Sequence, residues 1–265
     1  MSVVVSPRSP VLRRLVRSLA VYEGALPPGR ERVLPSAETS LMVNLHEDAF
    51  RTYDNGTLRR THGAALAGPR TRPTVIDTEE QRLILEVGFR FGGAAAFLPL
   101  ELCETRDELV ELDELWGREG AVLRERLLEA ATVEEKFAIV EAALLGRLRG
   151  SPEPEPAVAF AAAAFERGLP VSDVTSHVGM LPKRFVRRFR RGVGLTPKRF
   201  SRVRRLQRVL RTVGSTTEVD WAEVAFEHGF YDQSHLIHDF REHAEMTPAA
   251  YRPRSAAEWN HVPVH

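Results

Sequence analysis

The stretch that decides the fold is residues 171–200, which read VSDVTSHVGMLPKRFVRRFRRGVGLTPKRF. It has a partial echo in residues 221–251, which read WAEVAFEHGFYDQSHLIHDFREHAEMTPAAY. In each copy a glycine, Gly179 or Gly229, is followed by paired apolar residues at helical spacing and then by Thr-Pro-x-x-aromatic. The sequence therefore predicts two copies of one small helical unit, one of them strongly basic.

Each copy has the order helix, glycine turn, helix. In the first copy Pro182 suits the first position of the second helix, where its missing N–H costs nothing, and Phe185 and Phe189 face a core. Thr196 and Pro197 then cap a longer helix that we expect to run to about residue 213. The pattern predicts two helix-turn-helix units joined by a long helix, and the second helix of such a unit enters a major groove of DNA.

Charge is distributed unevenly along the chain, although the net charge is only +1. Residues 157–254 carry 17 Lys+Arg against 10 Asp+Glu, whereas residues 1–156 carry 20 against 25. Residues 182–211 contain thirteen basic residues and no acidic one. A solvated helix face normally mixes both signs, so this stretch favours contact with phosphate groups of a nucleic acid.

Residues 229–241 read GFYDQSHLIHDFR, and residues 247–252 read TPAAYR. This pattern closely resembles the signature of the AraC/XylS family of transcription regulators, and the resemblance covers roughly residues 157–252. It implies a sequence-specific DNA-binding transcription regulator that reads successive major grooves on one face of double-stranded DNA. Two positions depart from the family pattern: Leu181 stands where a serine cap is usual, and His238 stands where an arginine is usual.

Position within the family motif implies which side chains contact DNA. The residues expected to contact bases are Lys183, Arg184, Val186, Arg187, Gln233, Ser234, His235 and His238. The residues expected to contact phosphates are Arg188, Arg191, Lys198, Arg199, Arg202, Arg205 and Arg208. Because the second recognition helix is almost neutral, we expect it to read bases weakly or to contribute mainly hydrogen bonds.

β structure is expected early in the chain. Alternating apolar residues predict strands at residues 41–45 and 83–91. The Asn-Gly pair at Asn55 and Gly56 predicts a hairpin between them, because both central residues of a type I′ turn need positive φ. We therefore expect an α+β chain, with a small antiparallel sheet or barrel first and an all-helical domain last.

Helical patterns follow this β region. They begin at Thr105, and Thr132 with Glu135 fits a capping box. The two amphipathic helices expected here could cover the sheet or could pair with a second subunit, and the sequence does not choose between these.

The first part of the chain also resembles, less strongly, the sensor halves attached to some members of the same family. The likeness lies in residues 68–73, 92–97 and 113–117. It implies a cupin-like β fold that binds a small effector or mediates dimerisation. The metal-binding histidine motif of cupins is missing, so we expect neither a metal nor another cofactor.

Composition divides the chain into four parts. Residues 1–150 are the expected sensor or dimerisation domain, and residues 151–156 are a proline-rich linker. Residues 157–254 are the expected DNA-binding domain, and residues 255–265 are a tail. Double-stranded DNA is the expected partner, with a small effector, RNA polymerase and a second copy of the chain as further candidates.

Several function classes are disfavoured. Cys103 is the one cysteine, so no intrachain disulfide can form and a reducing cytoplasm fits. The longest apolar run falls far short of the ~20 residues that cross a bilayer, so no membrane is expected as a partner. We expect no enzyme, because no set of catalytic residues stands out. The alternative is a DNA-repair or DNA-modifying enzyme that uses the same DNA-binding module for targeting, with Cys103 as its nucleophile.

Overall fold

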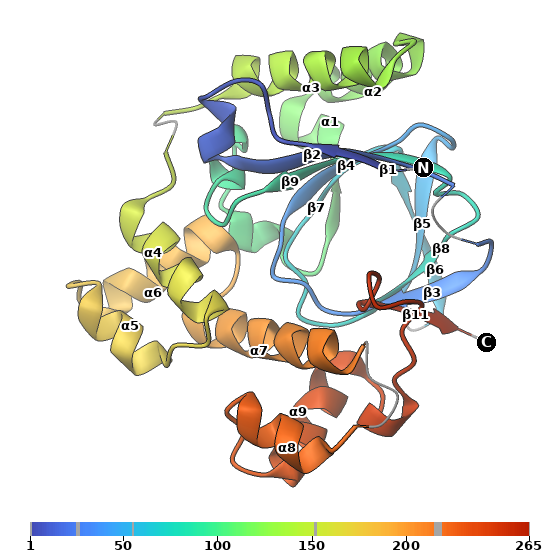
Figure 1. The fold of residues 1–265 in the computed structure, drawn as a ribbon. Coiled ribbons are helices and arrows are strands. Elements are labelled where there is room, and N and C mark those ends of the chain that lie inside the picture. Colours follow the sequence, from blue (N-terminus) through green and yellow to red (C-terminus); the bar gives the residue numbers. More distant parts are fainter. Residues whose placement is uncertain (1, 25–26, 55, 151–152, 215–218, 265) are drawn as a thin grey trace.

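The structure is a computed structural model that describes residues 2–24, 27–54, 56–150, 153–214 and 219–264. A β-rich domain comes first and a bundle of helices follows it, as Figure 1 shows. The expected α+β class is confirmed. The expectations that fall on Asn55 and on residues 151–152 lie outside the described residues.

Two antiparallel sheets face each other in the first domain (Figure 1). The six-stranded sheet has the order β1 (Ser2–Val5), β2 (Val16–Glu23), β9 (Leu83–Phe89), β4 (Ser40–Asn44), β7 (Ala64–Ala67), β10 (Leu109–Glu111). The five-stranded sheet has the order β11 (His261–Val264), β3 (Arg30–Val33), β8 (Thr74–Asp77), β5 (Ala49–Asp54), β6 (Thr57–His62). The expected hairpin is β5 with β6, in a register that pairs Asp54 with Thr57.

Strand β9 lies between a helix-covered core and a cavity, because successive side chains of a strand point to opposite faces of the sheet. Leu85 and Val87 are fully buried on the face covered by helices. Glu86, between them, points into a cavity between the two sheets. The strand expected at residues 83–91 is thus present, and its second face is polar because it lines this cavity.

Helices cover the outer face of the six-stranded sheet. They are α1 (Leu112–Trp116), α2 (Arg118–Glu129) and α3 (Val133–Arg147). Leu127 and Leu144 belong to the same buried core as the sheet residues, so α2 and α3 pack on this sheet (Figure 1). The expected capping box at Thr132 and Glu135 is confirmed, with both hydrogen bonds present.

The helical pattern expected from Thr105 is wrong in its first turns. Thr105 ends a short 3-10 helix, and Leu109 to Glu111 form β10, which pairs with β7. The α-helical structure begins at Leu112. Pairing with a distant strand has therefore overridden a local pattern that was too short to decide between strand and helix.

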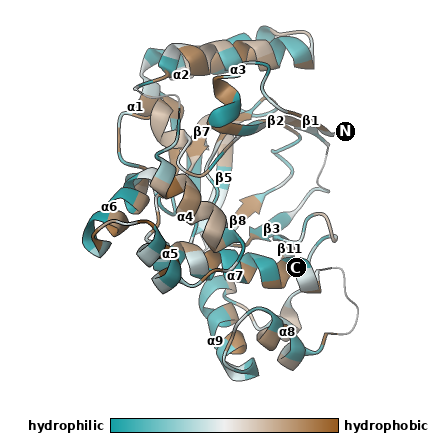
Figure 2. Cartoon of the chain, turned by 60° about the vertical axis from the view of Figure 1, so that its left-hand side comes forward, coloured by the Kyte–Doolittle hydropathy of each residue, from teal (hydrophilic) through white to brown (hydrophobic). Residues whose placement is uncertain are grey.

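The second domain is helical. Its helices are α4 (Pro156–Glu166), α5 (Val171–His177), α6 (Pro182–Val193), α7 (Pro197–Val213), α8 (Trp221–Glu227) and α9 (Gln233–Ala244), with a 3-10 turn at Pro248–Ala250. Hydrophilic residues dominate α6, whereas α4 is mostly hydrophobic (Figure 2). α7 joins two cores, because Phe200 lies with Phe185 and Phe189 while Leu210 lies with Leu236.

The end of the chain returns to the first domain. β11 adds to the edge of the five-stranded sheet by antiparallel pairing with β3, so that His261 lies opposite Val33. Leu34, which follows β3, is buried in the core of the second helix-turn-helix unit. The side chain of Gln207 on α7 donates to the carbonyl oxygen of Pro35 at 3.2 Å. The two domains are therefore packed against each other through α7 and the C-terminal strand.

Candidate nucleic-acid interface

The first recognition helix is α6. Gly179 makes the preceding turn with a φ of +67°, a conformation that side chains disfavour. Phe185 and Phe189 are fully buried and anchor the helix. The expected base-contacting residues of this helix, Lys183, Arg184, Val186 and Arg187, are all exposed. The helix therefore presents its first turns to solvent while its apolar side holds it in place.

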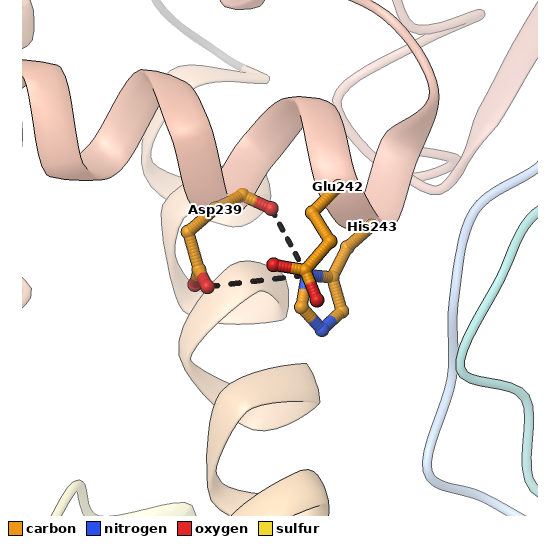
Figure 3. Close-up of side chains that lie close together, drawn as sticks. All are labelled: Asp239, Glu242 and His243. Atoms are coloured by element: carbon orange, nitrogen blue, oxygen red, sulfur yellow. Dashed lines mark hydrogen bonds and ion pairs between the residues drawn. The ribbon is translucent and has the colours of Figure 1, made fainter.

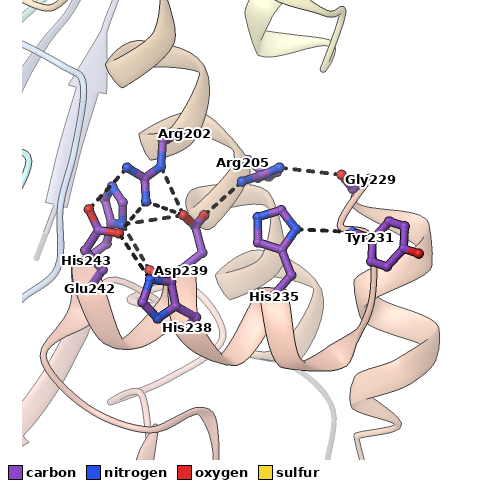
Figure 4. A network of polar contacts seen from close by, with 9 residues as sticks. All are labelled: Arg202, Arg205, Gly229, Tyr231, His235, His238, Asp239, Glu242 and His243. Carbon is purple, nitrogen blue, oxygen red and sulfur yellow. Dashed lines mark hydrogen bonds and ion pairs between the residues drawn. The ribbon is translucent and has the colours of Figure 1, made fainter.

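The second recognition helix is α9, and it begins with a firm cap. Asp232 accepts a hydrogen bond from the backbone N–H of His235 at 2.7 Å, and Leu236 and Phe240 are buried. The expected base-contacting residues Gln233, Ser234, His235 and His238 are all exposed. The His235 ring also accepts from the backbone N–H of Tyr231 at 3.3 Å (Figure 4), so it helps to order the turn as well.

The N-terminal caps of the two recognition helices differ. Leu181, at the N-cap of α6, makes no capping hydrogen bond and is 77% exposed. The cap of α7 is as expected from the sequence, because the Thr196 hydroxyl accepts from the N–H of Arg199. Pro170 stands at the N-cap of α5 and makes no side-chain capping hydrogen bond either.

Among the lysines and arginines expected to contact DNA, five have no hydrogen-bond or ion-pair partner for the side chain in the described residues. They are Lys183, Arg184, Arg187, Lys198 and Arg199. Three lie in the first turns of α6 and two in the first turn of α7. These side chains are available to an external anion without breaking a contact.

The other expected phosphate-contacting residues are engaged. Arg188 pairs with Glu155 of the linker at 2.5 Å, and Arg191 pairs with Glu101 of the first domain at 2.9 Å. Arg208 donates to the carbonyl oxygens of residues 165 and 166 at 3.3 Å each. Arg188 and Arg191 contact acidic groups that a phosphate could replace, whereas Arg208 ties α7 to the end of α4.

Arg202 and Arg205 meet a buried carboxylate on α9. Arg202 Nε lies 3.0 Å from Asp239 Oδ1, and Arg205 Nη2 lies 3.1 Å from Asp239 Oδ2 (Figure 4). Arg202 also pairs with Glu242 at 2.6 Å. Burial alone would raise the pKa of Asp239, but the hydrogen bond from Arg202 and the nearby guanidinium charges outweigh it and lower the pKa. These arginines therefore fix α9 on α7.

Asp239, Glu242 and His243 bring candidate metal-ligand atoms within 4.8 Å of one another (Figure 3). Arg202 donates to both carboxylates, and the His243 ring hydrogen-bonds the Asp239 carbonyl oxygen at 2.9 Å. Because the carboxylate oxygens already meet guanidinium groups, this arrangement is an ion-pair network that stabilises the helix contact, and we assign no metal to it.

A cavity of about 390 Å³ lies between the two sheets of the first domain. Polar residues at its wall include Arg17, Glu38, Arg70 and Glu86. Gln207 of α7 and residues 259–261 close one side of it. These residues were not expected from the sequence as members of a binding site. Two signals were present: Arg70 lies in the stretch 68–73 that resembles the sensor halves, and Glu86 is a carboxylate in an otherwise apolar strand.

Cys103 is partly exposed and lies in the 3-10 helix at residues 102–105, next to α6. Its Sγ lies 3.7 Å from Glu101 Oε2. The thiol also has a guanidinium as a hydrogen-bond partner, since Arg190 on α6 contacts Cys103.

The arrangement defines a class: a DNA-binding protein with two helix-turn-helix units behind a two-sheet β domain. The family described as helix-turn-helix domain matches residues 174–254, and a family described as a domain of unknown function, DUF6597, matches residues 5–111. Residues 174–254 therefore form a helix-turn-helix domain of the AraC type. No curated protein matches it at the significance required.

Solved structures that are similar to this chain include an apo variant of ToxT from Vibrio cholerae. It has 11% sequence identity and a TM-score of 0.44, over 88% of this chain and 95% of that chain. ToxT of Vibrio cholerae with a bound unsaturated fatty acid has 9% identity and a TM-score of 0.42, over 94% of each chain. The xylose-binding transcription activator xylR has 17% identity and a TM-score of 0.31, over 45% of this chain and 38% of that chain. Among the described residues, no helix is long and apolar enough to cross a membrane.

Proposed function

We propose that this chain regulates transcription by binding a specific sequence in double-stranded DNA through α6 and α9. The observation that carries the proposal is the exposure of both recognition helices at their first turns, where Lys183 and Gln233 are solvent-accessible while Phe185 and Leu236 are buried. Base edges are read by the N-terminal residues of such helices. The eight base-contacting residues expected from the sequence stay assigned in this proposal.

The proposed phosphate contacts fall into two groups. Lys198 and Arg199 are unpartnered and would contact phosphates directly. Arg188 and Arg191 would do so once they leave their glutamate partners. Arg202, Arg205 and Arg208 act in our proposal mainly by holding the helices in register, because each already has an intramolecular partner.

The first domain supplies control in this proposal. A small effector would bind in the cavity between the sheets, which has the volume of a typical ligand site. Gln207 contributes to the cavity wall from α7, so a bound effector would touch the helix that links the two helix-turn-helix units. We propose residues 1–150 as the sensor domain, residues 151–156 as the linker and residues 157–254 as the DNA-binding domain, acting in the cytoplasm. RNA polymerase and a second copy of the chain are further proposed partners, on the family resemblance alone.

Selection of binding sites from a random DNA pool with the full chain tests this proposal. We expect an enriched motif with two parts, one helical turn of DNA apart, and binding that weakens steeply with salt. Lys183→Ala should reduce the base preference in one part of the enriched motif, and Gln233→Ala should reduce it in the other part. Enrichment of no motif, or equal affinity for selected and random DNA, contradicts the proposal.

A further inference from the structure

The cavity of the first domain joins an apolar wall to a charged one. The apolar side chains that line it include Met42, Phe50, Ile76, Leu109 and Trp259. They come from both sheets and from the segment that precedes β11. A ligand of this site therefore needs an apolar body, and the charged groups decide what polar group it carries.

Most charged groups of the cavity already have partners. Arg17 and Glu38 form a two-point ion pair, with N–O distances of 2.7 and 2.8 Å. Glu86 accepts hydrogen bonds from Ser40 and Tyr22, and burial raises the pKa of this carboxyl, which favours its neutral form. His261 meets Glu31 at 2.9 Å, and burial lowers the pKa of its imidazole. Arg17 and Glu38 thus neutralise each other, and the pKa shifts of Glu86 and His261 favour their uncharged forms.

Arg70 differs from them. It lies just after β7 and lines both the cavity and a recess of about 40 Å³ beside it. Its guanidinium makes no hydrogen bond or ion pair with any residue that the structure describes. Burial lowers its pKa, with partial compensation from the charges of Asp107 and Glu108. The side chain of Arg70 is partly exposed. A cation that is partly removed from water gains from a nearby counter-charge.

The nearest acid does not pair with Arg70. Asp107 Oδ1 accepts from the backbone N–H of Thr71 at 2.6 Å, and Asp107 Oδ2 accepts from the Thr71 hydroxyl at 2.8 Å. Asp107 also lies 3.4 Å from Arg106. Glu108 pairs with Arg59 at 3.2 Å. The structure thus directs both neighbouring carboxylates to other residues and leaves the Arg70 guanidinium free.

We propose that the cavity binds a small organic anion, a carboxylate on an apolar body, with the carboxylate on Arg70. This inference rests on the proposed function, because it names the chemical class of the effector. The planar guanidinium presents parallel N–H donors that match a carboxylate at two points. The apolar side chains would contact the body of the ligand. A cationic ligand would meet an unpaired positive charge, and a neutral one would leave it unpaired.

Matched acids and amides test the inference on the full chain in the absence of DNA. The probes are benzoate, phenylacetate and 4-phenylbutyrate, each compared with its primary amide by isothermal titration calorimetry and thermal shift. We expect at least one acid to bind and to exceed its amide in affinity by about tenfold or more, since hydrogen bonds to charged groups are about twice as strong as neutral ones. This comparison needs no variant.

Two substitutions test whether Arg70 is the cation that binds the carboxylate of the ligand. Arg70→Gln should bring acid and amide to equal affinity, whereas Arg70→Lys should keep part of the preference. Arg72→Gln is the matched control, because Arg72 lies two residues away and pairs on the surface with Asp54 at 3.3 Å. It should leave the acid preference unchanged.

The inference is overturned if no acid in the panel binds, if acid and amide bind equally to the unchanged protein, or if Arg70→Gln keeps the preference. A parallel DNA-binding measurement separates this outcome from failure of the proposed function. If the chain binds specific DNA but shows no Arg70-dependent preference for acids, only the inference about the ligand is contradicted. If the chain binds acids through Arg70 but selects no DNA sequence, the proposed function is contradicted instead.

Discussion

Arg191 on the first recognition helix pairs with Glu101 of the β domain, with 2.9 Å between Nε and Oε1. One turn earlier, Arg188 pairs with Glu155 of the linker. Both arginines belong to the set expected to contact phosphates, so glutamates occupy positions that DNA phosphates would take. Under the proposed function, the first domain and the DNA would compete for these two arginines.

Glu101→Gln should therefore strengthen DNA binding. Both partners are about half exposed, so the pair is screened by solvent and contributes at most about 1 kcal/mol, or roughly fivefold in affinity. The measurement is a titration of labelled DNA at low and high salt, where the gain should shrink as salt rises. Glu114→Gln, an exposed change of equal charge on α1, is the control and should have little effect. Equal gains in both variants would show a general charge effect instead.

Base and phosphate contacts should respond differently to substitution. Arg187→Ala removes an exposed, unpartnered side chain from α6 and should cost about 1–3 kcal/mol on the selected site while relaxing base preference at one position. Lys198→Ala should weaken selected and random DNA alike and reduce the salt slope by about one. Competition titrations with point-changed sites distinguish the two. Parallel losses on cognate and random DNA for both variants would refute the assignment of Arg187.

Leu181→Ser should stabilise the first recognition helix. Leu181 occupies the N-cap of α6 in an extended conformation, makes no capping bond and buries little surface. A serine there can accept from the orphan N–H groups of the first turn, a contribution of about 1 kcal/mol. Asp232→Ala is the reciprocal change at α9, whose cap is present, and should destabilise by a similar amount. Hydrogen exchange in the first turn of each helix measures both. If the amide protection of the first turn of α6 were unchanged in Leu181→Ser, the expected stabilisation by a serine cap would be refuted.

The helix-turn-helix units could be predicted because their signals are local. Gly179 and Gly229 adopt the positive φ that their turns require, and Thr196 caps α7 as its sequence indicates. Burial of Phe185 and exposure of Lys183 follow from helical spacing alone. Such features depend on neighbours within one or two turns, which the sequence displays directly.

Long-range partners could not be predicted in the same way. The basic stripe of α7 gives no sign that Arg202 and Arg205 meet Asp239, more than thirty positions away. Nor does the sequence of residues 255–265 indicate that β11 pairs with β3, since the register depends on the placement of both domains. Arg70 is identified as unpartnered only when Asp107 is seen to bond Thr71. These relationships depend on tertiary structure.

Asp239→Asn should destabilise the second helix-turn-helix unit. The carboxylate is only 4% exposed and accepts from both Arg202 and Arg205, so its loss leaves two partly buried guanidinium groups short of a counter-charge. Breaking such a pair costs about 3 kcal/mol. Urea unfolding of the full chain measures the change. Glu242→Gln is the control, since Glu242 is 49% exposed and its loss should cost less than about 1 kcal/mol. Similar costs for both would contradict a special role for the buried carboxylate.

The same carboxylate should make the stability difference depend on pH. The pKa of Asp239 in the folded chain lies below its ordinary value, so its contribution is present above the unfolded-state pKa of about 3.9 and is lost as pH falls through the folded-state pKa. The gap in unfolding free energy between the natural chain and Asp239→Asn should therefore be constant above about pH 5 and narrow below about pH 4. Urea titrations at a series of pH values test this. If the difference in unfolding free energy stayed constant down to the lowest pH tested, protonation of Asp239 would not be linked to the stability of the contact between α7 and α9.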